Sequence, residues 1–401
     1  MRHKFPLSWP IISFKEVAEV VTGTTPLTSH PEYYGGSLPF IGPAELGKVE
    51  SITQSPKSLS HDGSKQARLL PAETVLVCCI GATIGKVGFS GTQLATNQQI
   101  NALVCNKDIV FPRYVFHYCQ TLESLIRHQG ASTTLPLLPK GRFQEIEIPI
   151  PPLEEQRRIA EILDHAEKLR SKRREAIAQL NTLTQAIFLE MFGDPVKNPK
   201  GWKRLPFAEL LTNIDSGWSP ICLDRRVFGE EWGVLKLGAV TWCEYNPTEN
   251  KALPPGVEPN QNLEVKSGDL LFTRKNTYEL VAACALVRET PPRLMMSDLI
   301  FRFRLCADAG VNSYYLHQLL IYPTKRRNIQ KLAGGSASSM PNISKAKLQT
   351  TLIEVPPLAL QQEFTQRVEA VEKLKASHRA LLSELDALFA SLQHRAFRGE
   401  L

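Results

Sequence analysis

The 401-residue sequence lacks the segments that mark membrane and secreted proteins. Its longest apolar stretch, Val75 to Ala82, is far shorter than the roughly 20 residues that a membrane-spanning helix needs. The charged N-terminus is not followed by an apolar run, so no signal peptide is predicted. Hydrophobic residues make up 43% and charged residues 22%, which excludes a mostly disordered chain. We therefore expect folded domains that work in the cytoplasm, away from the membrane.

Metal-ligand spacing is also missing. The eight cysteines are scattered, no C-x2-4-C pair occurs, and no histidine pair lies beside a cysteine pair. In a chain of this length, such cysteines are expected to be reduced, small core residues of a cytosolic protein. The sequence thus predicts neither a metal site nor a disulfide framework.

Catalytic motifs are absent as well. Neither H-E-x-x-H nor G-x-S-x-G occurs. Gly81–Val87 imitates a phosphate-binding loop, but it has three rather than four residues between its glycines, and Val87 replaces the required Ser or Thr. None of the four Pro-Pro pairs forms the Asn/Asp-Pro-Pro-aromatic motif of amino-methyltransferases. The chain is therefore expected to recognise a partner, with no catalytic residues and no cofactor of its own.

What the sequence does contain is an internal repeat. The pattern P-P-L-x-x-Q occurs at Pro151–Gln156 and again at Pro356–Gln361, an offset of 205 residues. Nearer the N-terminus, Gly23-Thr24-Thr25-Pro26 resembles Gly217-Trp218-Ser219-Pro220. These matches predict a tandem duplication of one unit of about 200 residues.

Each P-P-L-x-x-Q motif opens a predicted long helix. A proline pair suits the start of a helix, and no Gly or Pro follows until about Met191 and Ala396. About 38 residues at 1.5 Å each give a rod of roughly 57 Å. Apolar residues recur every three to four positions, so we expect the two helices to bury their seams against each other; the alternative is that each helix lies on its own domain. The predicted seam comprises Ile159, Ala166, Leu169, Arg173, Leu180, Leu183, Ile187, Phe364, Val371, Leu374, His378, Leu385, Leu388 and Leu392.

Arg173 and His378 interrupt the two seams at the same place, again 205 residues apart. Polar seam residues commonly fix the register of paired helices. In an antiparallel pair the midpoints meet, so we expect these two residues to lie close together, with His378 neutral or with Glu175 compensating. The alternative is that both side chains reach solvent.

The segments between the helices are predicted to mix α and β structure. Apolar, β-branched runs predict strands, and longer patterns with Tyr, Phe and Leu on one face predict helices at 112–128 and 312–332. The predicted strands are Val75–Ile80, Ile100–Val104, Leu270–Thr273 and Leu299–Leu305.

The positive charge is concentrated in one of these segments. Residues 1–147, 148–195, 196–352 and 353–401 carry net charges of +2, −1, +7 and −1. A basic globular domain beside nearly neutral helices suits a phosphate-backbone partner. For the first segment, a charge of +2 fits an ordinary solvated surface equally well.

Cations in several places are candidate DNA ligands. Arg274, Lys275 and Asn276 follow a predicted strand, and Arg and Asn can bind guanine and adenine edges; a solvated turn is the alternative. Candidate phosphate contacts lie at a helix end, on a strand and in a loop of the second domain, with fewer in the first. These are Lys325, Arg326, Arg327, Arg302, Arg304, Arg225 and Arg226, then Lys86, Lys140 and Arg142.

Two small polar loops recur at the 205-residue offset. Gly130–Thr134, with Ser132 and Thr133, and Gly335–Ser339, with Ser338, each precede a proline. Their hydroxyl and backbone N–H groups could contact DNA, although Gly- and Ser-rich stretches also serve as linkers.

Taken together, these motifs resemble the specificity subunit of type I restriction–modification systems. The resemblance rests on Pro151–Gln156 with its helix, on Phe192–Trp202, and on Pro356–Gln361 with its helix. It covers the whole chain in the order target-recognition domain, conserved helix, target-recognition domain, conserved helix. The corresponding ranges are 1–147, 148–195, 196–352 and 353–401.

The resemblance implies an α+β architecture: two mixed α/β target-recognition domains joined by two long antiparallel coiled-coil helices, with pseudo-twofold symmetry. Each domain would read one half of a bipartite target in double-stranded DNA. Two modification subunits would methylate adenine with S-adenosylmethionine, and two ATP-dependent restriction subunits would complete the nuclease. The second helix has Ala359-Leu360 where the first has Glu154-Glu155, which leaves any role of an acidic pair open.

Two physical considerations bear on this function. Half-sites read from one face of the duplex should lie about one helical turn, ~10 bp, apart centre to centre. The competing hypothesis is a coiled-coil adaptor that binds protein without reading DNA. Such an adaptor would not need a globular domain with a net charge of +7.

Overall fold

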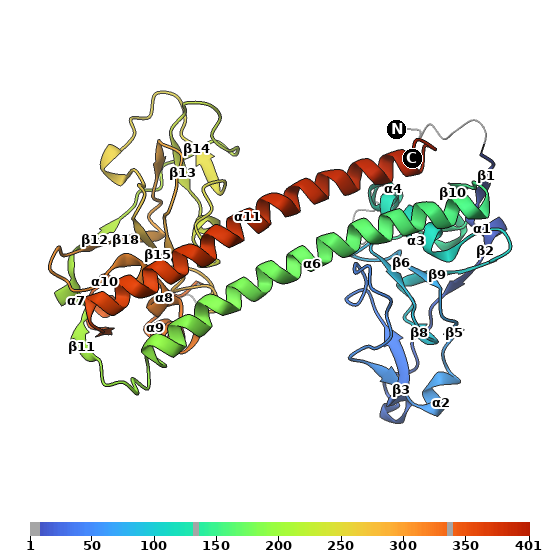
Figure 1. Cartoon of the computed structure of the whole chain (residues 1–401), viewed down its shortest axis with the longest axis horizontal. Helices are drawn as coiled ribbons and strands as arrows, with labels where there is room; N and C mark the ends of the chain where they lie inside the picture. Colours follow the sequence, from blue (N-terminus) through green and yellow to red (C-terminus); the bar gives the residue numbers. More distant parts are fainter. Residues whose placement is uncertain (1–8, 131–135, 335–339) are drawn as a thin grey trace. The chain divides into compact units, whose positions relative to one another are not determined.

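A computed structural model of the chain describes residues 9–130, 136–334 and 340–401. The predicted DNA contacts Ser132, Thr133 and Ser338 lie outside the described residues. The chain divides into two compact units, which are described here one at a time. Unit 1 comprises residues 1–176 and 378–401, and unit 2 comprises residues 177–377 (Figure 1). Each unit thus contains one globular region and part of each long helix.

Unit 1 is built around an antiparallel sheet with the strand order β2-β9-β6-β7. Its β6 strand alternates: Val75 and Val77 face a core shared with helices, while Leu76 and Cys78 face a core shared with a second sheet. The sheet therefore lies between a helical layer and another sheet, as Figure 1 shows. The strands are β2 (Ala18–Thr22), β6 (Val75–Cys78), β7 (Val87–Phe89) and β9 (Ile100–Cys105).

The helical layer of unit 1 consists of α3 (Pro112–Thr121), α4 (Glu123–Gln129), the first part of α6 (Leu153–Phe192) and the last part of α11 (Leu358–Ala396). The second sheet has the order β4-β3-β8-β5 and pairs β3 with β8 in parallel. Its strands are β3 (Tyr34–Ile41), β4 (Ser58–Leu59), β5 (Leu69–Leu70) and β8 (Leu94–Thr96). The smaller elements are β1 (Ile11–Ser13), α1 (Phe14–Val17), η1 (Pro31–Tyr33), α2 (His61–Ser64), α5 (Lys140–Phe143) and β10 (Glu147–Pro149).

Unit 2 has a central antiparallel sheet of the same pattern, with the order β12-β18-β15-β16. Leu270 and Phe272 of β15 face the helix-side core, and Leu271 faces the core of a second sheet, β14-β13-β17. In that second sheet, β13 and β17 are parallel, as β3 and β8 are in unit 1. The strands are β12 (Leu211–Ser216), β13 (Gly233–Leu235), β14 (Asn250–Ala252), β15 (Leu270–Thr273), β16 (Cys284–Leu286), β17 (Leu294–Met295) and β18 (Ile300–Leu305).

The helical layer of unit 2 consists of α8 (Ser313–Ile321), α9 (Pro323–Gln330), the first part of α11 and the last part of α6. An antiparallel pair, β11 with β19, matches the β1–β10 pair of unit 1. The smaller elements are β11 (Lys203–Pro206), α7 (Phe207–Leu210), η2 (Leu237–Ala239), η3 (Gln261–Leu263), α10 (Lys345–Gln349) and β19 (Leu352–Val355).

The elements agree closely with those that the sequence predicts. All four predicted strands are present, and α6 and α11 begin directly after their proline pairs, with 40 and 39 residues. The helices predicted at 112–128 and 312–332 are each two helices instead. In the second case the break falls at Tyr322, because Pro323 cannot continue the preceding helix.

The glutamine of each P-P-L-x-x-Q motif fastens its helix to the globular region. The Gln156 amide donates to the carbonyl oxygens of Ile109 and Pro151, and its oxygen accepts from the Phe111 N–H. Gln361 makes the same three bonds, to Gly310 O, Pro356 O and Asn312 N. Both side chains are fully buried. A long amide at this position therefore satisfies three backbone groups at once, which explains why the motif occurs twice.

Each long helix packs part of its predicted seam onto a globular region. In unit 1, α6 packs Ile159, Ala160 and Leu163 into the core, and in unit 2, α11 buries Phe364 and Val368 in the same way. This packing onto the globular region fixes the rotation of each helix about its axis. Four predicted seam residues are consequently exposed by 43–53% and do not lie in a seam. They are Leu169, Leu183, Leu374 and Leu388.

The other predicted seam residues are buried or partly buried. Within unit 1, Arg170 Nε lies 2.6 Å from Asp386 Oδ1, and Arg173 Nη1 donates to His378 Nδ1 at 2.8 Å. Because Arg can only donate, His378 Nδ1 is the acceptor in this hydrogen bond. The same set includes Ile159, Ala166, Phe364 and Val371, which are buried, and Leu180, Ile187, Leu385 and Leu392, which are half-buried.

Candidate nucleic-acid interface

Each central sheet ends at a cluster of loops. In unit 1, β2 ends and β9 begins beside the end of β6, so the segments 23–26, 96–99 and 79–86 come together there. In unit 2 the corresponding segments are 217–220, 296–299 and 274–277. Loops at the end of a rigid sheet are a common place for binding residues.

The two loop clusters are held by the same backbone hydrogen bonds. Gly23 N donates to Ile100 O at 3.0 Å, and Gly217 N donates to Ile300 O at 3.4 Å. A third loop joins in both units, because Leu138 N donates to Cys79 O, and Ile343 N donates to Arg274 O, each at 2.8 Å. The repeat seen in the sequence is therefore a repeat of detailed loop geometry.

The glycine of each G-x-[ST]-P loop is required for this geometry. A Cβ atom on Gly23 would lie 2.2 Å from Asn97 O, and one on Gly217 would lie 2.2 Å from Ser297 O. No side chain fits at such distances, so the two loops approach closely only with glycine at these positions. Next to each glycine, a hydroxyl bonds across to the opposite loop: Thr25 to Gln98, and Ser219 to Asp298.

In unit 2 the loop cluster is surrounded by cations. Arg274 follows β15 directly, donates to Asn342 Oδ1 at 3.1 Å, and lies over the Phe301 ring at 5.2 Å. Lys345 lies over the same ring at 5.7 Å. Lys275 is half-buried and forms a backbone bridge with Asn342. These three cations form a basic site, defined here as Arg274, Lys275 and Lys345.

Sequence reasoning missed Lys345 and its neighbour Lys347, although the repeat contained the signal. They lie 205 residues after Lys140 and Arg142, which were predicted. Both pairs begin the short helix that follows the third loop, α5 in unit 1 and α10 in unit 2. By contrast, Asn276 is buried and its amide donates to Thr241 Oγ1, so it does not present a free amide.

In unit 1, two of the three positions of the basic site are uncharged, and the third is Lys140. Cys79 and Ile80 stand where unit 2 has Arg274 and Lys275, and burial raises the pKa of the Cys79 thiol to about 12. The predicted cations Lys86, Lys140 and Arg142 are all exposed. Three carboxamides dominate the opposite loop, where Asn97 donates to Gln99 Oε1 at 3.0 Å and Gln98 is exposed.

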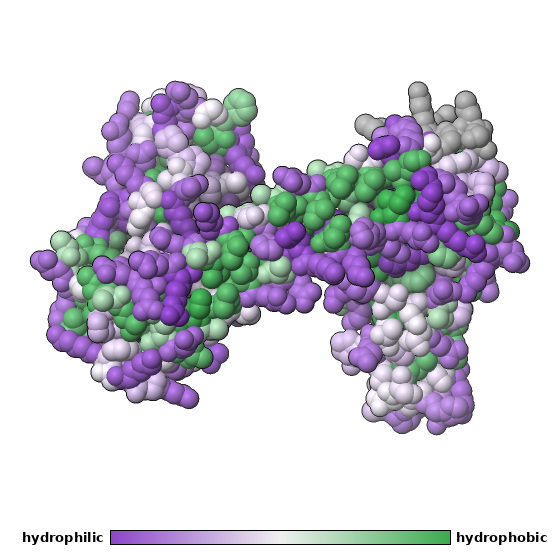
Figure 2. All heavy atoms as spheres, viewed as in Figure 1, coloured by the Kyte–Doolittle hydropathy of each residue, from purple (hydrophilic) through white to green (hydrophobic). Residues whose placement is uncertain are grey.

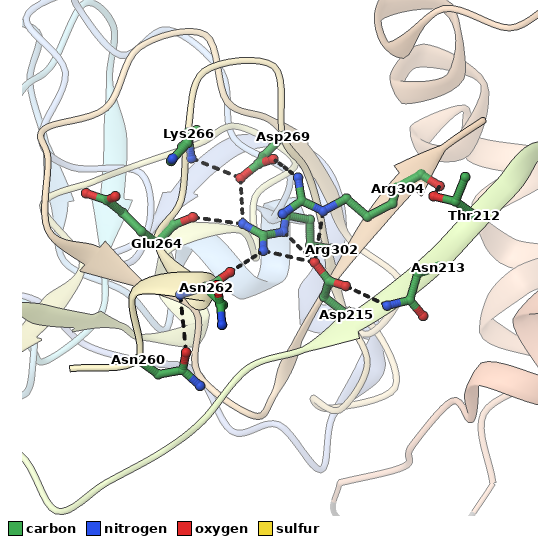
Figure 3. A network of polar contacts seen from close by, with 10 residues as sticks. All are labelled: Thr212, Asn213, Asp215, Asn260, Asn262, Glu264, Lys266, Asp269, Arg302 and Arg304. Atoms are coloured by element: carbon green, nitrogen blue, oxygen red, sulfur yellow. Dashed lines mark hydrogen bonds and ion pairs between the residues drawn. The ribbon is translucent and has the colours of Figure 1, made fainter. Parts of the chain in front are cut away.

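Arg302, predicted as a phosphate contact, is instead buried in an ion network, and its side chain is 2% exposed (Figure 3). It bonds Asp215 and Asp269 at 3.0 Å each, and donates to the backbone carbonyls of Asn262 and Glu264. Arg304, two residues along the same strand, also bonds Asp215 but remains 44% exposed. The charge of Arg302 is therefore fully used inside the unit.

This network controls the charge of Asp215. Burial alone would raise its pKa, but the hydrogen bonds from Arg302 and Arg304 outweigh burial and hold the pKa below its usual value. Because Arg302 also donates hydrogen bonds to two loop carbonyls, the network connects η3 to the central sheet. It is a structural device beneath the loop cluster.

The predicted Lys325–Arg327 cluster is only partly available. Lys325 is 5% exposed and bonds Glu354 at 2.6 Å, and its burial lowers its pKa. Arg326 donates to the backbone carbonyls of Glu279, Leu280 and Val281, whereas Arg327 is exposed. These residues are in the middle of the eight-residue helix α9, and Arg327 lies in its last turn. Lys325 and Arg326 hold parts of unit 2 together.

The loop cations Arg225 and Arg226 lie beside carboxylates. Arg225 makes a bidentate pair with Glu231 at 2.7 Å, which lowers the pKa of that carboxyl to about 2. Arg226 lies 3.8 Å from Glu249. Both side chains are exposed, but neighbouring acids offset much of their charge.

Metal clusters and membrane-spanning helices are both absent from the described ranges. No group of three or more His, Cys, Asp or Glu residues in them could hold a metal ion. Likewise, none of their helices has the length and apolar character needed to cross a membrane.

The chain was compared with known proteins. Residues 6–181 match the family described as "Type I restriction modification DNA specificity domain". Over 176 residues the chain is 36% identical to the EcoEI specificity subunit of Escherichia coli, covering 44% of this chain but 30% of that protein. The MjaIX specificity subunit of Methanocaldococcus jannaschii is 28% identical, over 53% of this chain and 54% of that protein. The chain thus spans about half or less of these two relatives.

Two longer matches cover the chain almost completely. The EcoKI specificity subunit of Escherichia coli K12 is 24% identical over 99% of this chain and 90% of that protein. A crystal structure of the type I restriction–modification S subunit from M. genitalium has a TM-score of 0.60 at 13% identity, covering 99% of both chains. At this identity the structural likeness concerns the fold.

Proposed function

We propose that this chain, which belongs to the type I restriction–modification specificity-subunit family, is the non-catalytic subunit that reads a bipartite sequence in double-stranded DNA. The single observation that carries the proposal is the repeated loop cluster. Two sheets of the same order end in loops held by the same bonds, with cations beside them. One scaffold used twice with different loop residues suits the reading of two different half-sites.

The basic site of unit 2 is the part we assign to the phosphate backbone. Arg274, Lys275 and Lys345 lie together at the loop cluster, whereas the charges of Arg302 and Lys325 are used internally. Cations at loop ends can bind phosphates and release counterions, which gives affinity without sequence preference. In unit 1, Lys86, Lys140 and Arg142 take this role.

We further propose that the chain arose by tandem duplication and that its long helices form an antiparallel coiled coil. The domains would be 1–147 and 196–352, with helices in 148–195 and 353–401. Helix direction within unit 1 supports this: Arg158 meets Leu401, while Arg173, further along α6, meets the earlier residue His378. Related domains on such a spacer would bind half-sites about 10 bp apart.

The exposed leucines of the long helices are proposed to bind the modification subunits. Unit 1 exposes Leu169 and Leu388, and unit 2 exposes Leu183 and Leu374, which lie at the 205-residue offset. Figure 2 shows hydrophobic side chains gathered on the long helices. Because the same apolar surface occurs twice, it would bind two copies of one partner. Two restriction subunits would then bind to the complex of this chain with its modification subunits.

Catalysis then belongs to the partners. The modification subunits would supply S-adenosylmethionine chemistry, the restriction subunits would use ATP and Mg²⁺, and the assembly would work in the cytoplasm, where its DNA target is found. A protein-only adaptor is not favoured, because it would have no use for two loop clusters with a basic site.

Measuring DNA binding at several salt concentrations tests this function. We expect the chain, assembled with its modification subunits, to bind one bipartite duplex selected from a random library. The double variant Arg274→Ala/Lys275→Ala should lower the slope of log Kd against log salt by about one to two units without changing the selected sequence. Arg225→Ala, whose cation is already paired with Glu231, is the matched control. Selection of no sequence by the wild-type complex would overturn the proposal.

A further inference from the structure

At the tip of each loop cluster, one exposed residue occupies an equivalent position in the two units. Gln98 in unit 1 lies two residues before the first residue of β9, and Asp298 in unit 2 lies two residues before the first residue of β18. Both are exposed. Each is held from the opposite loop by a hydroxyl, Thr25 for Gln98 and Ser219 for Asp298. The scaffold beneath them is the same, but the chemical group that they present differs.

Beneath each tip lies an unusual buried hydroxyl. Thr96 and Ser297 are 0% and 6% exposed, and neither hydroxyl has a hydrogen-bond partner among the described residues. A buried unpaired hydroxyl typically costs about 1–3 kcal/mol. Such unpaired groups call for an explanation. Each unit has one in the segment that carries its tip, although the two positions are not equivalent, because Thr96 corresponds to Met296.

Of the two groups, the carboxylate of Asp298 gives the stronger evidence about which base is bound. It lies in the loop whose Leu299 carbonyl accepts from the Arg274 N–H, next to the basic site. A carboxylate repels phosphates, so it weakens DNA binding unless it accepts a hydrogen bond from a base. Cytosine N4 is the amino group that Asp and Glu accept from in the major groove, whereas a Gln amide pairs with adenine N6 and N7.

We propose that Gln98 and Asp298 are specificity-determining residues, with Gln98 reading an adenine in one half-site and Asp298 reading a cytosine in the other. Thr25 and Ser219 act as positioning residues that hold the two tips. The inference rests on the proposed function, because it needs the sheet ends to face DNA. It adds which side chains distinguish bases and which base each prefers.

The test replaces the amide of Gln98 with a carboxylate and the carboxylate of Asp298 with an amide. The complex with the modification subunits is prepared with Gln98→Glu or with Asp298→Asn, and target sequences are selected from a random duplex library. With Asp298→Asn, one position of one half-site should change from cytosine to adenine, and with Gln98→Glu, one position of the other half-site should change from adenine to cytosine. Each preference should shift by roughly 5- to 150-fold, the discrimination of one good base contact.

The controls carry the same charge changes elsewhere in each unit. Gln66→Glu and Asp308→Asn alter exposed residues outside the segments that form the loop clusters, and both should leave the selected sequence unchanged. A wild-type complex that selects no sequence would overturn the proposed function itself. A wild-type complex that selects a sequence, together with tip variants that select the same one, would overturn this inference and leave the function standing.

Discussion

The two central sheets share their strand order but fill one buried position in opposite ways. In unit 1, Ala102 of β9 lies between Val21 and Leu76 of its neighbouring strands. In unit 2 the equivalent residue is Arg302 of β18, which lies between Asp215 and Leu271. An apolar contact in one unit is therefore replaced by an ion network in the other.

The difference shows how one scaffold supports different loops. In unit 2, Arg302 donates to the carbonyls of Asn262 and Glu264, and the adjacent Leu263 carbonyl accepts from the N–H of Met296, which begins the segment 296–299. Unit 1 supports its loop through Asn97 N, which donates to Ile41 O of β3. The sheet keeps its geometry, while the residues between the sheets adapt to the loops that they carry.

The largest expected effect comes from breaking the ion network. Arg302→Leu leaves Asp215 and Asp269 without their buried partner, and it should lower the free energy of unfolding of unit 2 by about 3–5 kcal/mol. Urea unfolding followed by tryptophan fluorescence measures this, because Trp202, Trp218, Trp232 and Trp242 lie in unit 2.

The matched control is Arg225→Leu, which removes an exposed pair and should cost no more than about 1 kcal/mol. If both substitutions cost the same, the network does not carry the stability assigned to it. Hydrogen exchange in β6 of unit 1 should be unaffected by either substitution.

A smaller effect, equal in the two units, is expected at the repeated glutamines. Gln156→Leu and Gln361→Leu each leave three backbone groups without their side-chain partner, one of them in a buried bond and two in partly buried ones, which should cost about 2–3 kcal/mol of local stability. Hydrogen exchange in the sheet of the affected unit measures the loss. Gln362→Leu, at an exposed position next to Gln361, is the control; a loss confined to one unit would show that the two motifs are not equivalent.

The smallest expected effect is a pH dependence of stability that differs between the two units. His317 is buried, its Nε2 donates to the carbonyls of Cys243 and Cys284, and burial lowers its pKa to about 4. Because the unfolded chain binds a proton near pH 6.5 and the folded unit does not, stability is fully present above pH 6.5 and falls as pH drops toward 4. The slope should be at most about 1.4 kcal/mol per pH unit.

His317→Gln should remove this contribution. The difference in unfolding free energy between wild type and variant should then shrink by about 2 kcal/mol between pH 6.5 and pH 5. Tryptophan fluorescence during urea unfolding provides the measurement. In unit 1 the buried His117 lies 2.8 Å from the Asp164 carboxylate, so it does not share this environment. An unchanged difference across the pH range would contradict the assignment.

Sequence alone determined the features that depend on local patterns. The repeat, the limits of α6 and α11 and the strands followed from proline pairs, apolar spacing and motifs, and residues 6–181 match the specificity-domain family that the motifs resemble. Arg274 and Lys275 were correctly placed at a strand end. Lys345 could also have been found, since it matches Lys140 at the repeat offset.

Only the tertiary structure decided which polar residues are available to a partner. Arg302 meets Asp215 and Asp269 from 87 and 33 residues away, and Lys325 meets Glu354 from 29 residues away. The exposed leucines depend on how each globular region sets the rotation of its helix. Gln98 and Asp298 could be identified as tips only from their hydrogen bonds with Thr25 and Ser219 in the folded structure. Local patterns specify helices and strands, but whether a charge is buried, paired or free depends on contacts that only folding brings together.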